Sequence, residues 1–372
     1  MSPPTDIVVI GAGIVGCATA YELARRGASV QVVDDRPAGM GATQASAGVL
    51  APYIEARDDS PLLELTVRSL GLYDKFVARV SSVSGLPLTY RRSGTLDIAT
   101  EEESLARFEQ QRVMLSRRGV AAEIVDATAV RREEPQLADG VLGGLVIPEH
   151  GYVVAGELTR ALAAAARRHG AQLIEHGRVK RIVERDGELV VETERGPLTG
   201  NGVVIAAGSW SGQIEVAGVT ATLPVRPVRG QLLHLAWSGV PLRRVIWGER
   251  CYLVPWEDGT LLVGATVEEA GFDERTTAAG VHDLIDAACE IVPHAWTAGL
   301  ISAKAGLRPG TSDDLPVIGM STVVPNLMYA TGHFRNGVLL APLTAQFVAD
   351  TMLENRVDPM LTITRPQRFG RL

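Results

Sequence analysis

Three glycines and an acidic residue near the start of the chain have the types and spacing of a nucleotide clamp. Gly11, Gly13 and Gly16 form the pattern Gly-x-Gly-x-x-Gly, and Asp34 follows 18 residues after the last of them. The first glycine of such a pattern permits a tight turn, and the second lets the backbone approach a pyrophosphate. The third lets a helix pack closely on a strand, and the acid binds a ribose hydroxyl. A plain glycine-rich corner is the alternative, and the flanking elements decide between the two.

Those elements are a strand, a helix and a second strand. The residues 7–10 form a β-branched run, which is typical of a parallel strand buried on both faces. An apolar helical pattern follows and ends at Gly27, and the strand 30–33 then delivers Asp34. Asp34 and Asp35 would repel a 2′-phosphate, so NADP is disfavoured, whereas NAD and FAD both stay open. This context favours nucleotide binding.

Length and charge exclude several classes of function. At 372 residues the chain exceeds the usual size of one core, which predicts two joined domains. The net charge of −7, without a basic cluster, argues against a nucleic-acid partner. No signal peptide or run of membrane-spanning length is evident, so we expect no membrane partner and a cytoplasmic location. Cys17, Cys251 and Cys289 lack a metal-ligand spacing, so we expect no metal site and interpret them as small buried or half-buried thiols. A homo-oligomer stays open.

Two further segments follow strands where a cofactor would lie. The loop 36–48 is rich in small residues, and its hydroxyls and bare backbone favour a second cofactor contact over a flexible loop. The strand 203–206 is followed by Ala207, Gly208 and Trp210, which are expected to flank the cofactor. The alternative is a plain turn with a packing tryptophan. In 331–342 a strand, a loop and a helix start succeed one another, and free N–H groups at that start favour an electron-rich partner such as a flavin carbonyl.

The rest of the chain predicts a second domain built on an antiparallel sheet. Strands are expected in 88–100, 228–237, 245–247, 252–255 and 260–266, and helices in 60–80, 101–118, 157–169 and 278–291. Hairpins are predicted at Asp186-Gly187, between 179–183 and 189–193, and at Asp258-Gly259.

The motifs resemble a known family. The clamp followed by Ala-Thr-x-x-Ser-Ala-Gly (42–48) is similar to FAD-dependent amine oxidases of the D-amino acid oxidase superfamily. Within it, Cys-Tyr-Leu-Val-Pro (251–255), Leu-Leu-Val-Gly-Ala-Thr (261–266), Ala-Gly-Leu-Arg-Pro-Gly-Thr (305–311) and Gly-His-Phe-Arg-Asn-Gly-Val-Leu-Leu-Ala-Pro (332–342) resemble the glycine oxidases of the thiamine pathway.

The resemblance implies an α/β plus α+β architecture. A Rossmann-like FAD-binding domain of the GR2 type would comprise residues 1–82, 150–214 and 303–372. A substrate domain built on an antiparallel sheet would comprise residues 83–149 and 215–302. The implied activity is oxidation of glycine, sarcosine or small D-amino acids to the imine, with dioxygen reduced to hydrogen peroxide. The implied partners are therefore a small amino acid and dioxygen.

The resemblance also implies roles for named residues. Arg308 would bind the substrate carboxylate, with Tyr252 and Arg335 beside it, which suits the two-pronged geometry of a guanidinium. A structural ion pair of Arg308 with Asp313 or Asp314, packing by Tyr252 and cofactor anchoring by Arg335 are the alternatives. His333 is expected to pack beside the flavin. The residues expected to bind non-covalent FAD are Gly11, Gly13, Ile14, Val15, Gly16, Asp34, Asp35, Ala42, Thr43, Ser46, Ala47, Gly48, Val49, Val179, Ala207, Gly208, Trp210, His333, Phe334, Arg335, Asn336, Gly337, Val338 and Leu339.

The chain departs from the family pattern at a few positions, and two other classes of function stay open. Arg250 stands where the glycine oxidases have His, Val49 where they have Met, and Val154-Ala155 where they have an acid followed by Pro. Two of these departures are expected near the pocket, which leaves the preferred substrate open. The other classes are a flavin dehydrogenase that uses a quinone or protein acceptor, and a non-catalytic NAD-binding or FAD-binding regulator.

Overall fold

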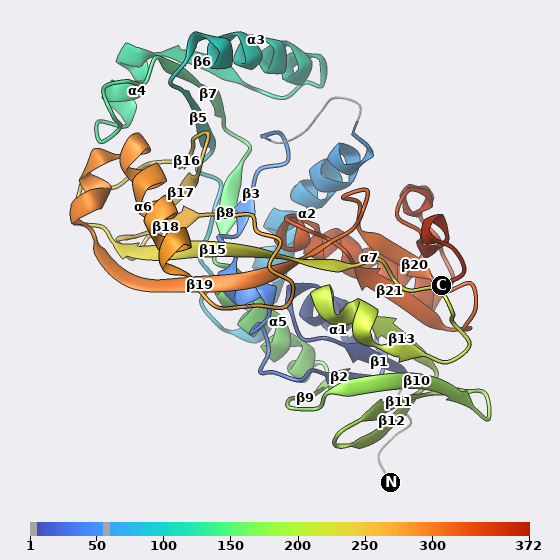
Figure 1. Cartoon of the computed structure of the whole chain (residues 1–372). Helices are drawn as coiled ribbons and strands as arrows, with labels where there is room; N and C mark the ends of the chain where they lie inside the picture. Colours follow the sequence, from blue (N-terminus) through green and yellow to red (C-terminus); the bar gives the residue numbers. More distant parts are fainter. Residues whose placement is uncertain (1–5, 55–59) are drawn as a thin grey trace.

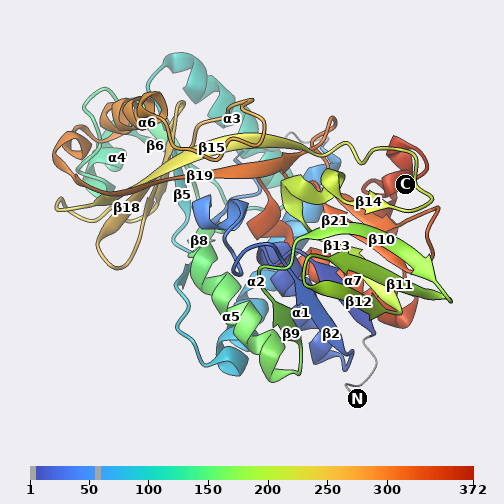
Figure 2. The same ribbon diagram turned by 60° about the horizontal axis from the view of Figure 1, so that its bottom comes forward.

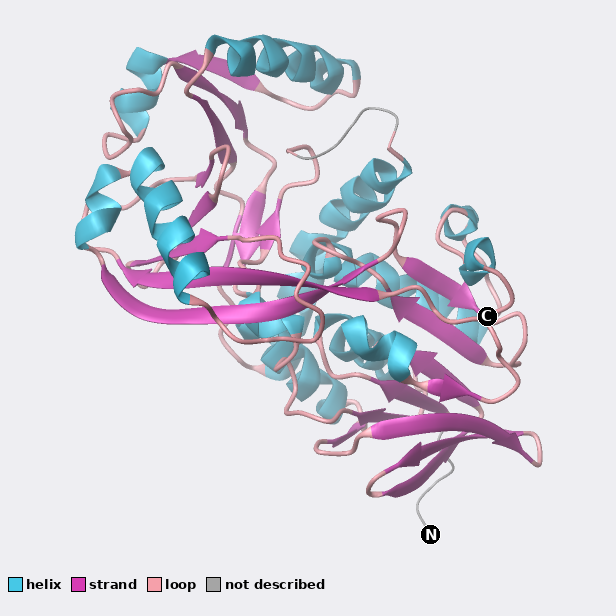
Figure 3. Ribbon diagram, viewed as in Figure 1, coloured by secondary structure: helices cyan, strands magenta, loops and turns pink. Residues whose placement is uncertain are grey.

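A six-stranded sheet and an eight-stranded sheet carry most of the strands of the chain (Figure 1, Figure 3). The structure is a computed structural model, and it describes residues 6–54 and 60–372. The two long strands β15 (Arg226–Ala236) and β19 (Gly299–Gly310) run from the region of the large sheet toward the region of the smaller one. Figure 2 shows the same arrangement from a second direction.

The six-stranded sheet has the order β20-β21-β13-β1-β2-β9 and is parallel except for the antiparallel pair β20 and β21. Its centre is β1, which is buried on both faces as its β-branched sequence predicts. The strands are β1 (Ile7–Ile10), β2 (Val30–Val33), β9 (Gln172–Ile174), β13 (Gly202–Ile205), β20 (Val317–Met320) and β21 (Leu327–Thr331).

Alternate residues of β1 belong to two different cores. Ile7 and Val9 pack among four helices, whereas Val8 and Ile10 pack against a four-stranded sheet on the other face. The helices are α1 (Ile14–Arg25), α2 (Pro61–Ser84), α5 (Ala155–Arg168) and α7 (Gly337–Glu354). The four-stranded sheet has the order β12-β11-β10-β14, made of β10 (Val179–Arg185), β11 (Glu188–Thr193), β12 (Gly196–Gly200) and β14 (Glu215–Val216).

The eight-stranded sheet has the order β19-β15-β18-β17-β16-β5-β7-β6. Its neighbours are antiparallel except for the parallel pair β5 and β16. One face packs its apolar residues against α6 (Ala278–Ile291). Its remaining strands are β5 (Thr95–Ala99), β6 (Glu123–Asp126), β7 (Gly143–Ile147), β16 (Val245–Trp247), β17 (Tyr252–Pro255) and β18 (Thr260–Gly264).

Smaller elements complete the fold. A three-stranded sheet has the order β3-β8-β4, made of β3 (Val49–Leu50), β4 (Tyr90–Arg91) and β8 (Gly151–Val153). Two helices, α3 (Glu102–Arg117) and α4 (Ala127–Glu133), lie beside β6 and β7. The 3-10 helices are η1 (Ala42–Ala45), η2 (Gly208–Gln213), η3 (Pro293–Thr297), η4 (Pro359–Thr362) and η5 (Pro366–Phe369).

The predicted mixture of a parallel nucleotide-type sheet and an antiparallel sheet is confirmed. Both predicted hairpins form, because β10 pairs with β11 across Asp186-Gly187 and β17 pairs with β18 across Asp258-Gly259. The sequence did not predict β19, a strand of twelve residues that pairs along the whole of β15. The division into two domains stays a prediction, and its boundary at residue 303 falls inside β19.

Candidate active site

A large cavity of about 1410 Å³ is lined by residues from both of the main sheets. It is lined by the segments that follow β1, β2, β13 and β21, and by residues of β17 and β19. In open parallel sheets, ligands bind beyond the carboxyl ends of the strands. The cavity therefore occupies the position that this topology predicts for a ligand.

The glycine clamp forms a tight turn at the wall of this cavity. Gly11 has a φ of +107°, and a Cβ there would lie 2.4 Å from the carbonyl oxygen of Ala206. Gly13 is the N-cap of α1 and lines the cavity, together with Ile14 and Val15. Gly16 does not line it, and a Cβ at Gly16 would fall 1.9 Å from the Gly11 carbonyl oxygen. Gly16 thus lets α1 pack on the turn, which is the structural role expected of the third glycine.

Asp34 lines the cavity and fastens the clamp to the end of β2. Its carboxylate accepts hydrogen bonds from the N–H of Ala12 at 2.5 Å and from the N–H of Arg36 at 2.8 Å. Burial raises the pKa of Asp34, although both N–H donors favour the ionised form. Each oxygen keeps a further lone pair, so the carboxylate can still accept a hydroxyl donor.

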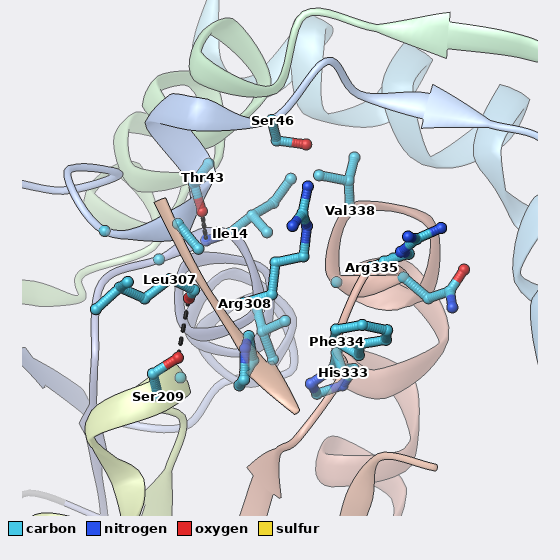
Figure 4. A pocket seen from close by; sticks show the side chains of 18 of the residues that line it. Ile14, Thr43, Ser46, Ser209, Leu307, Arg308, His333, Phe334, Arg335 and Val338 are labelled. Carbon is cyan, nitrogen blue, oxygen red and sulfur yellow. Dashed lines mark hydrogen bonds between the residues drawn. The ribbon is translucent and has the colours of Figure 1, made fainter. Parts of the chain in front are cut away.

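The loop 36–48 is held against α1. The Ile14 N–H donates to Oγ1 of Thr43 at 3.1 Å, as Figure 4 shows, and Gly48 N–H donates to Oγ of Ser46 at 3.2 Å. Thr43 and Ser46 both line the cavity. The strand β19 crosses this loop closely, since a Cβ at Gly306 would lie 2.9 Å from Cβ of Ala45.

The segment after β13 is fixed by side-chain bonds and lines the same cavity. Oγ of Ser209 donates to the carbonyl oxygen of Leu307 at 2.9 Å (Figure 4), and Oγ1 of Thr331 donates to that of Gly208 at 3.0 Å. Trp210 packs against the Arg36 guanidinium, which lies 4.5 Å from the centre of its ring. The tryptophan therefore has a packing role as well as a place at the cavity wall.

A second helix begins at the cavity. Asn336 is the N-cap of α7 and makes no side-chain capping bond, and Asn336 to Leu339 line the cavity. The N–H groups at this end carry the partial positive charge of the helix, which favours an electron-rich or anionic partner. His333 precedes the helix and is buried, and its Nε2 lies 3.0 Å from Oγ1 of Thr344. Burial lowers the pKa of His333 to about 4, so the imidazole is neutral near pH 7.

Arg308, Tyr252 and Arg335 line the same cavity. Nη1 of Arg308 donates to the carbonyl oxygen of Thr266 at 2.9 Å. Figure 4 shows the side chains of Arg308, which belongs to β19, and Arg335, which precedes α7, at the wall of this pocket. The ring of Tyr252 stacks on that of Trp247, with centroids 4.8 Å apart.

The structure bears on the alternative role for Arg308. Both carboxylate oxygens of Asp313 accept from Arg368, at 2.7 Å from Nε and 3.3 Å from Nη2. A hydrogen bond from Leu315 N–H, at 3.2 Å, also ends on this carboxylate. Asp313 is therefore engaged elsewhere, which weakens the interpretation of Arg308 as its structural partner. Asp314, the other predicted partner, lines the same cavity as Arg308 and stays an alternative.

The cavity fits a flavin dinucleotide. Its volume exceeds the roughly 300 to 1,000 Å³ of sites for drug-sized ligands. Helices α1 and α7 both present their N-termini to it, which suits a pyrophosphate at one and an electron-rich ring at the other. Gly208 has a φ of +53° and open space where a Cβ would stand, so its backbone is accessible to a ligand.

Every residue predicted to contact FAD or substrate lines this one cavity, with the exception of Gly16. Their roles stay predictions. Sequence reasoning did not single out Arg36, Arg178, Lys180, Gln213 or Trp247, which also line it. Two signals in the sequence could have found some of them, because Arg36 stands in the loop 36–48 and because Arg178 and Lys180 flank Val179, both already expected at the cofactor.

Of the positions that depart from the family pattern, Val49 and Arg250 line the cavity, whereas Val154 and Ala155 do not. Arg250 is paired with two acids of α6, at 2.8 Å to Asp286 and in a second ion pair with Glu290. These pairs tie the segment before β17 to α6, so Arg250 contributes to the scaffold of the cavity rim.

Comparison with known proteins identifies the family. The family model described as "FAD dependent oxidoreductase" matches residues 6–351. The chain belongs to this family of FAD-dependent oxidoreductases. FAD is therefore its cofactor, and the cavity described above is where the structure offers room for it.

Individual relatives agree with this assignment. The chain is 36% identical over 96% of its length to the bifunctional protein ThiO/ThiG of Nostoc sp., and it spans about half of that relative, 54%. It is 32% identical over 95% of its length to a glycine oxidase of Bacillus licheniformis, covering 94% of that protein. The crystal structure of glycine oxidase from Geobacillus kaustophilus superposes with a TM-score of 0.91 at 32% identity, over 99% of this chain and 98% of that one.

The part of the chain that the structure describes offers neither a membrane-spanning helix nor a metal site. No helix there has the length and apolarity needed to cross a membrane. Within residues 6–54 and 60–372, no group of three or more His, Cys, Asp or Glu could hold a metal ion.

Proposed function

We propose that this protein is an FAD-dependent oxidase of glycine or other small amino acids, such as sarcosine and small D-amino acids. The product is the imine, which hydrolyses to the 2-oxo acid, and dioxygen is reduced to hydrogen peroxide. The observation that carries the proposal is that the guanidinium of Arg308 and the nucleotide clamp line one cavity. Relatives named glycine oxidase, and the ThiO/ThiG proteins, support these substrates and a part in thiamine biosynthesis.

The chain's own residues bind and orient the substrate. Arg308 binds the carboxylate through its planar fork of donors, and Tyr252 adds a hydroxyl contact beside it. Arg335 supplies a second positive charge at the same space. A carboxylate fixed in this way leaves the α-carbon one orientation, which is how positioning contributes to the rate. When bound, FAD supplies the chemistry by accepting a hydride from that carbon.

The proposed mechanism requires no dedicated catalytic base, because a neutral amine can lose a hydride directly to the flavin. His333 is buried and bonded to Thr344, and its pKa of about 4 leaves it a poor proton acceptor. It therefore packs beside the cofactor in our proposal. The FAD is held by the clamp, the loop 36–48, Val179, the segment after β13 and the start of α7.

Non-covalent binding of FAD belongs to the same proposal. Cys251 is the cysteine that lines the cavity among the described residues, and burial raises the pKa of its thiol to about 12. A protonated thiol is a poor nucleophile, which disfavours a covalent link to the flavin. A cytoplasmic location and self-association into a homo-oligomer complete the proposal.

A peroxide assay tests the proposed function. The purified holoenzyme is given glycine, sarcosine, D-alanine and D-proline under air, and peroxide and oxygen uptake are both measured. The proposal expects peroxide in equal amount to the oxygen consumed with at least one of these substrates. Reduction of an artificial dye without peroxide would instead show a dehydrogenase, and no substrate-driven bleaching of the flavin would favour the regulator.

A further inference from the structure

The guanidinium of Arg308 contacts two backbone carbonyl groups. Nη1 donates to the carbonyl oxygen of Thr266 at 2.9 Å and approaches that of Arg229 at 3.4 Å. Thr266 follows β18, and Arg229 lies in β15. The position of Arg308 in the cavity thus depends on two segments that meet beside the site.

One carboxylate joins these two segments. Oε2 of Glu268 accepts from Nε and Nη2 of Arg229, at 3.1 and 2.5 Å, and its Oε1 accepts from the hydroxyl of Thr266. The same Oε1 accepts from Nε2 of Gln231 at 2.7 Å. The backbones of Glu268 and Arg229 also exchange two hydrogen bonds of 2.9 Å, which form an isolated bridge.

The carboxylate of Glu268 is the acceptor in each of these side-chain hydrogen bonds, and an ionised carboxylate accepts best. The bonds therefore favour its ionised form. Burial opposes ionisation, but the hydrogen bonds from Thr266, Gln231 and Arg229 outweigh it and hold the pKa of Glu268 below its usual value. The side chain of Arg229 is 8% exposed and that of Glu268 28% exposed, so the pair is partly shielded from water. Such a network keeps its members in one arrangement only while every bond is made.

Glu268 does not line the large cavity. It lines a smaller cavity of about 650 Å³, and the two cavities share Glu249, Arg250, Ala265 and Arg335. Thr266 and Arg229, which both bond to this carboxylate, are the residues whose carbonyl groups contact Arg308.

We propose that Glu268 is a positioning residue, which holds the Thr266 and Arg229 carbonyl groups where they aim the guanidinium of Arg308 at the substrate carboxylate. The proposal rests on the carboxylate-binding role proposed for Arg308. In Glu268→Gln an amide N–H₂ would face a donor wherever it is placed, so the network loses at least one bond. The guanidinium of Arg308 should then lose its fixed orientation toward the substrate carboxylate, while it keeps its charge.

The test measures carboxylate binding and turnover separately in the FAD-loaded protein. Acetate is titrated while the flavin absorption is followed, and KM and kcat are measured with glycine. Glu268→Gln should weaken acetate binding and raise KM by about tenfold to a hundredfold, with a much smaller change in kcat. Thr266→Val keeps the carbonyl but removes two hydroxyl bonds, the one donated to Glu268 and the one accepted from the Gln231 N–H at 2.9 Å. It should move both quantities in the same direction by a smaller factor.

Asp273→Asn is the matched control. Asp273 accepts from Nη1 of the same Arg229 at 3.0 Å, and no hydrogen bond joins it to Thr266 in the described structure. Asp273→Asn removes the negative charge that Asp273 places beside Arg229. The variant should keep the parental KM and acetate affinity. Equal effects of Asp273→Asn and Glu268→Gln would overturn the proposal, because Glu268 would then act only by stabilising Arg229.

Two further outcomes separate this proposal from the proposed function. If the parent oxidises glycine and neither Glu268→Gln nor Thr266→Val changes acetate binding, the positioning role is wrong and the function stands. If the parent does not oxidise amino acids but binds acetate, and Glu268→Gln weakens that binding, the function is wrong and the positioning role stands. If Glu268→Gln does not fold, Thr266→Val decides alone, and a parental acetate affinity in it overturns the proposal.

Discussion

The guanidinium of Arg308 lies directly over Gly230 of the neighbouring strand β15. A Cβ at Gly230 would fall 2.2 Å from both Nη1 and Nη2 of Arg308 and 2.3 Å from Cζ. Atoms that are not bonded cannot approach so closely, and the absence of a side chain at this position is what makes room for the arginine. A similar relationship holds at Gly264, where a Cβ would lie 2.6 Å from the hydroxyl oxygen of Tyr252.

Gly230→Ala should therefore impair substrate binding more than folding. The new methyl group must displace the flexible end of Arg308, which can move without disturbing the sheet. We expect kcat/KM for glycine to fall by about a hundredfold, as a 1 Å misplacement of a positioning group can cause. Gly71→Ala is the control, because nothing lies within 4 Å of the Cβ it would add on α2. A Gly230→Ala enzyme with parental kcat/KM would show that the aim of Arg308 is unimportant.

Removing the Arg308 side chain should abolish most of the activity toward amino acids. Loss of one partner of a desolvated charge pair costs about 2 to 5 kcal/mol, so Arg308→Ala should lower kcat/KM by roughly two to three orders of magnitude. Arg308→Lys should recover only part, since an ammonium cannot reproduce the two-pronged contact. Simple amines, which lack the carboxylate, should be poor substrates that hardly respond to the change. A lower melting temperature with equal losses for amines and amino acids would instead reveal a structural arginine.

The purified protein should be yellow and release its flavin. Precipitation with acid is expected to leave the colour in the supernatant, with one FAD per chain by absorbance, because the cavity offers no reactive thiol among the residues described. Colour retained in the precipitate would indicate a covalent link, and a control digestion of the supernatant with phosphodiesterase should yield FMN.

The buried carboxyl of Asp97 should make stability depend on pH. It lies on β5, between Leu145 and Trp247 of the adjacent strands, and burial raises its pKa to about 7. The folded state therefore binds a proton more tightly than the unfolded chain, whose Asp has a pKa of 3.8. This contribution is full below about pH 4 and is lost as pH rises through about 7.

Asp97→Asn should remove that dependence while keeping the size of the side chain. Relative to the parent, the variant should gain up to about 4 kcal/mol of unfolding free energy at pH 8 and much less at pH 5. Urea denaturation at the two pH values measures this difference. A gain of equal size at both would assign the effect to something other than the ionisation of Asp97.

The sequence predicts those elements that are specified by residues close together in the chain, and it misses those that depend on distant residues. The clamp, the hairpin turns and the helix α3 follow from residues that are neighbours in the chain, and their predicted positions agree with the structure within a few residues. The strand β19 was missed because Gly306, Pro309 and Gly310 are poor strand formers, and it is a strand only because β15 pairs with it.

The hydrogen-bond network of Glu268 beside the site could not be predicted from the sequence either. Glu268 stands between Val267 and Glu269, where a charge at the end of a strand is typical of a solvated surface. Its partners Arg229 and Gln231 are nearly forty residues away, so only the folded structure brings them to it. In contrast, Arg308 could be proposed from its motif because the residues that define the motif are adjacent in the sequence.

The long pair of strands β15 and β19 also limits how this protein can be divided or recombined. In β19, residues 299–304 belong to the far end of the large sheet, whereas Gly306 touches the loop beside the clamp and Arg308 lines the cavity. A chimaera joined at residue 303 would take the two halves of this strand from different parents, while both must match one β15. Exchange of substrate preference between relatives should therefore succeed only when β15, β19 and the segment 264–268 are transplanted together.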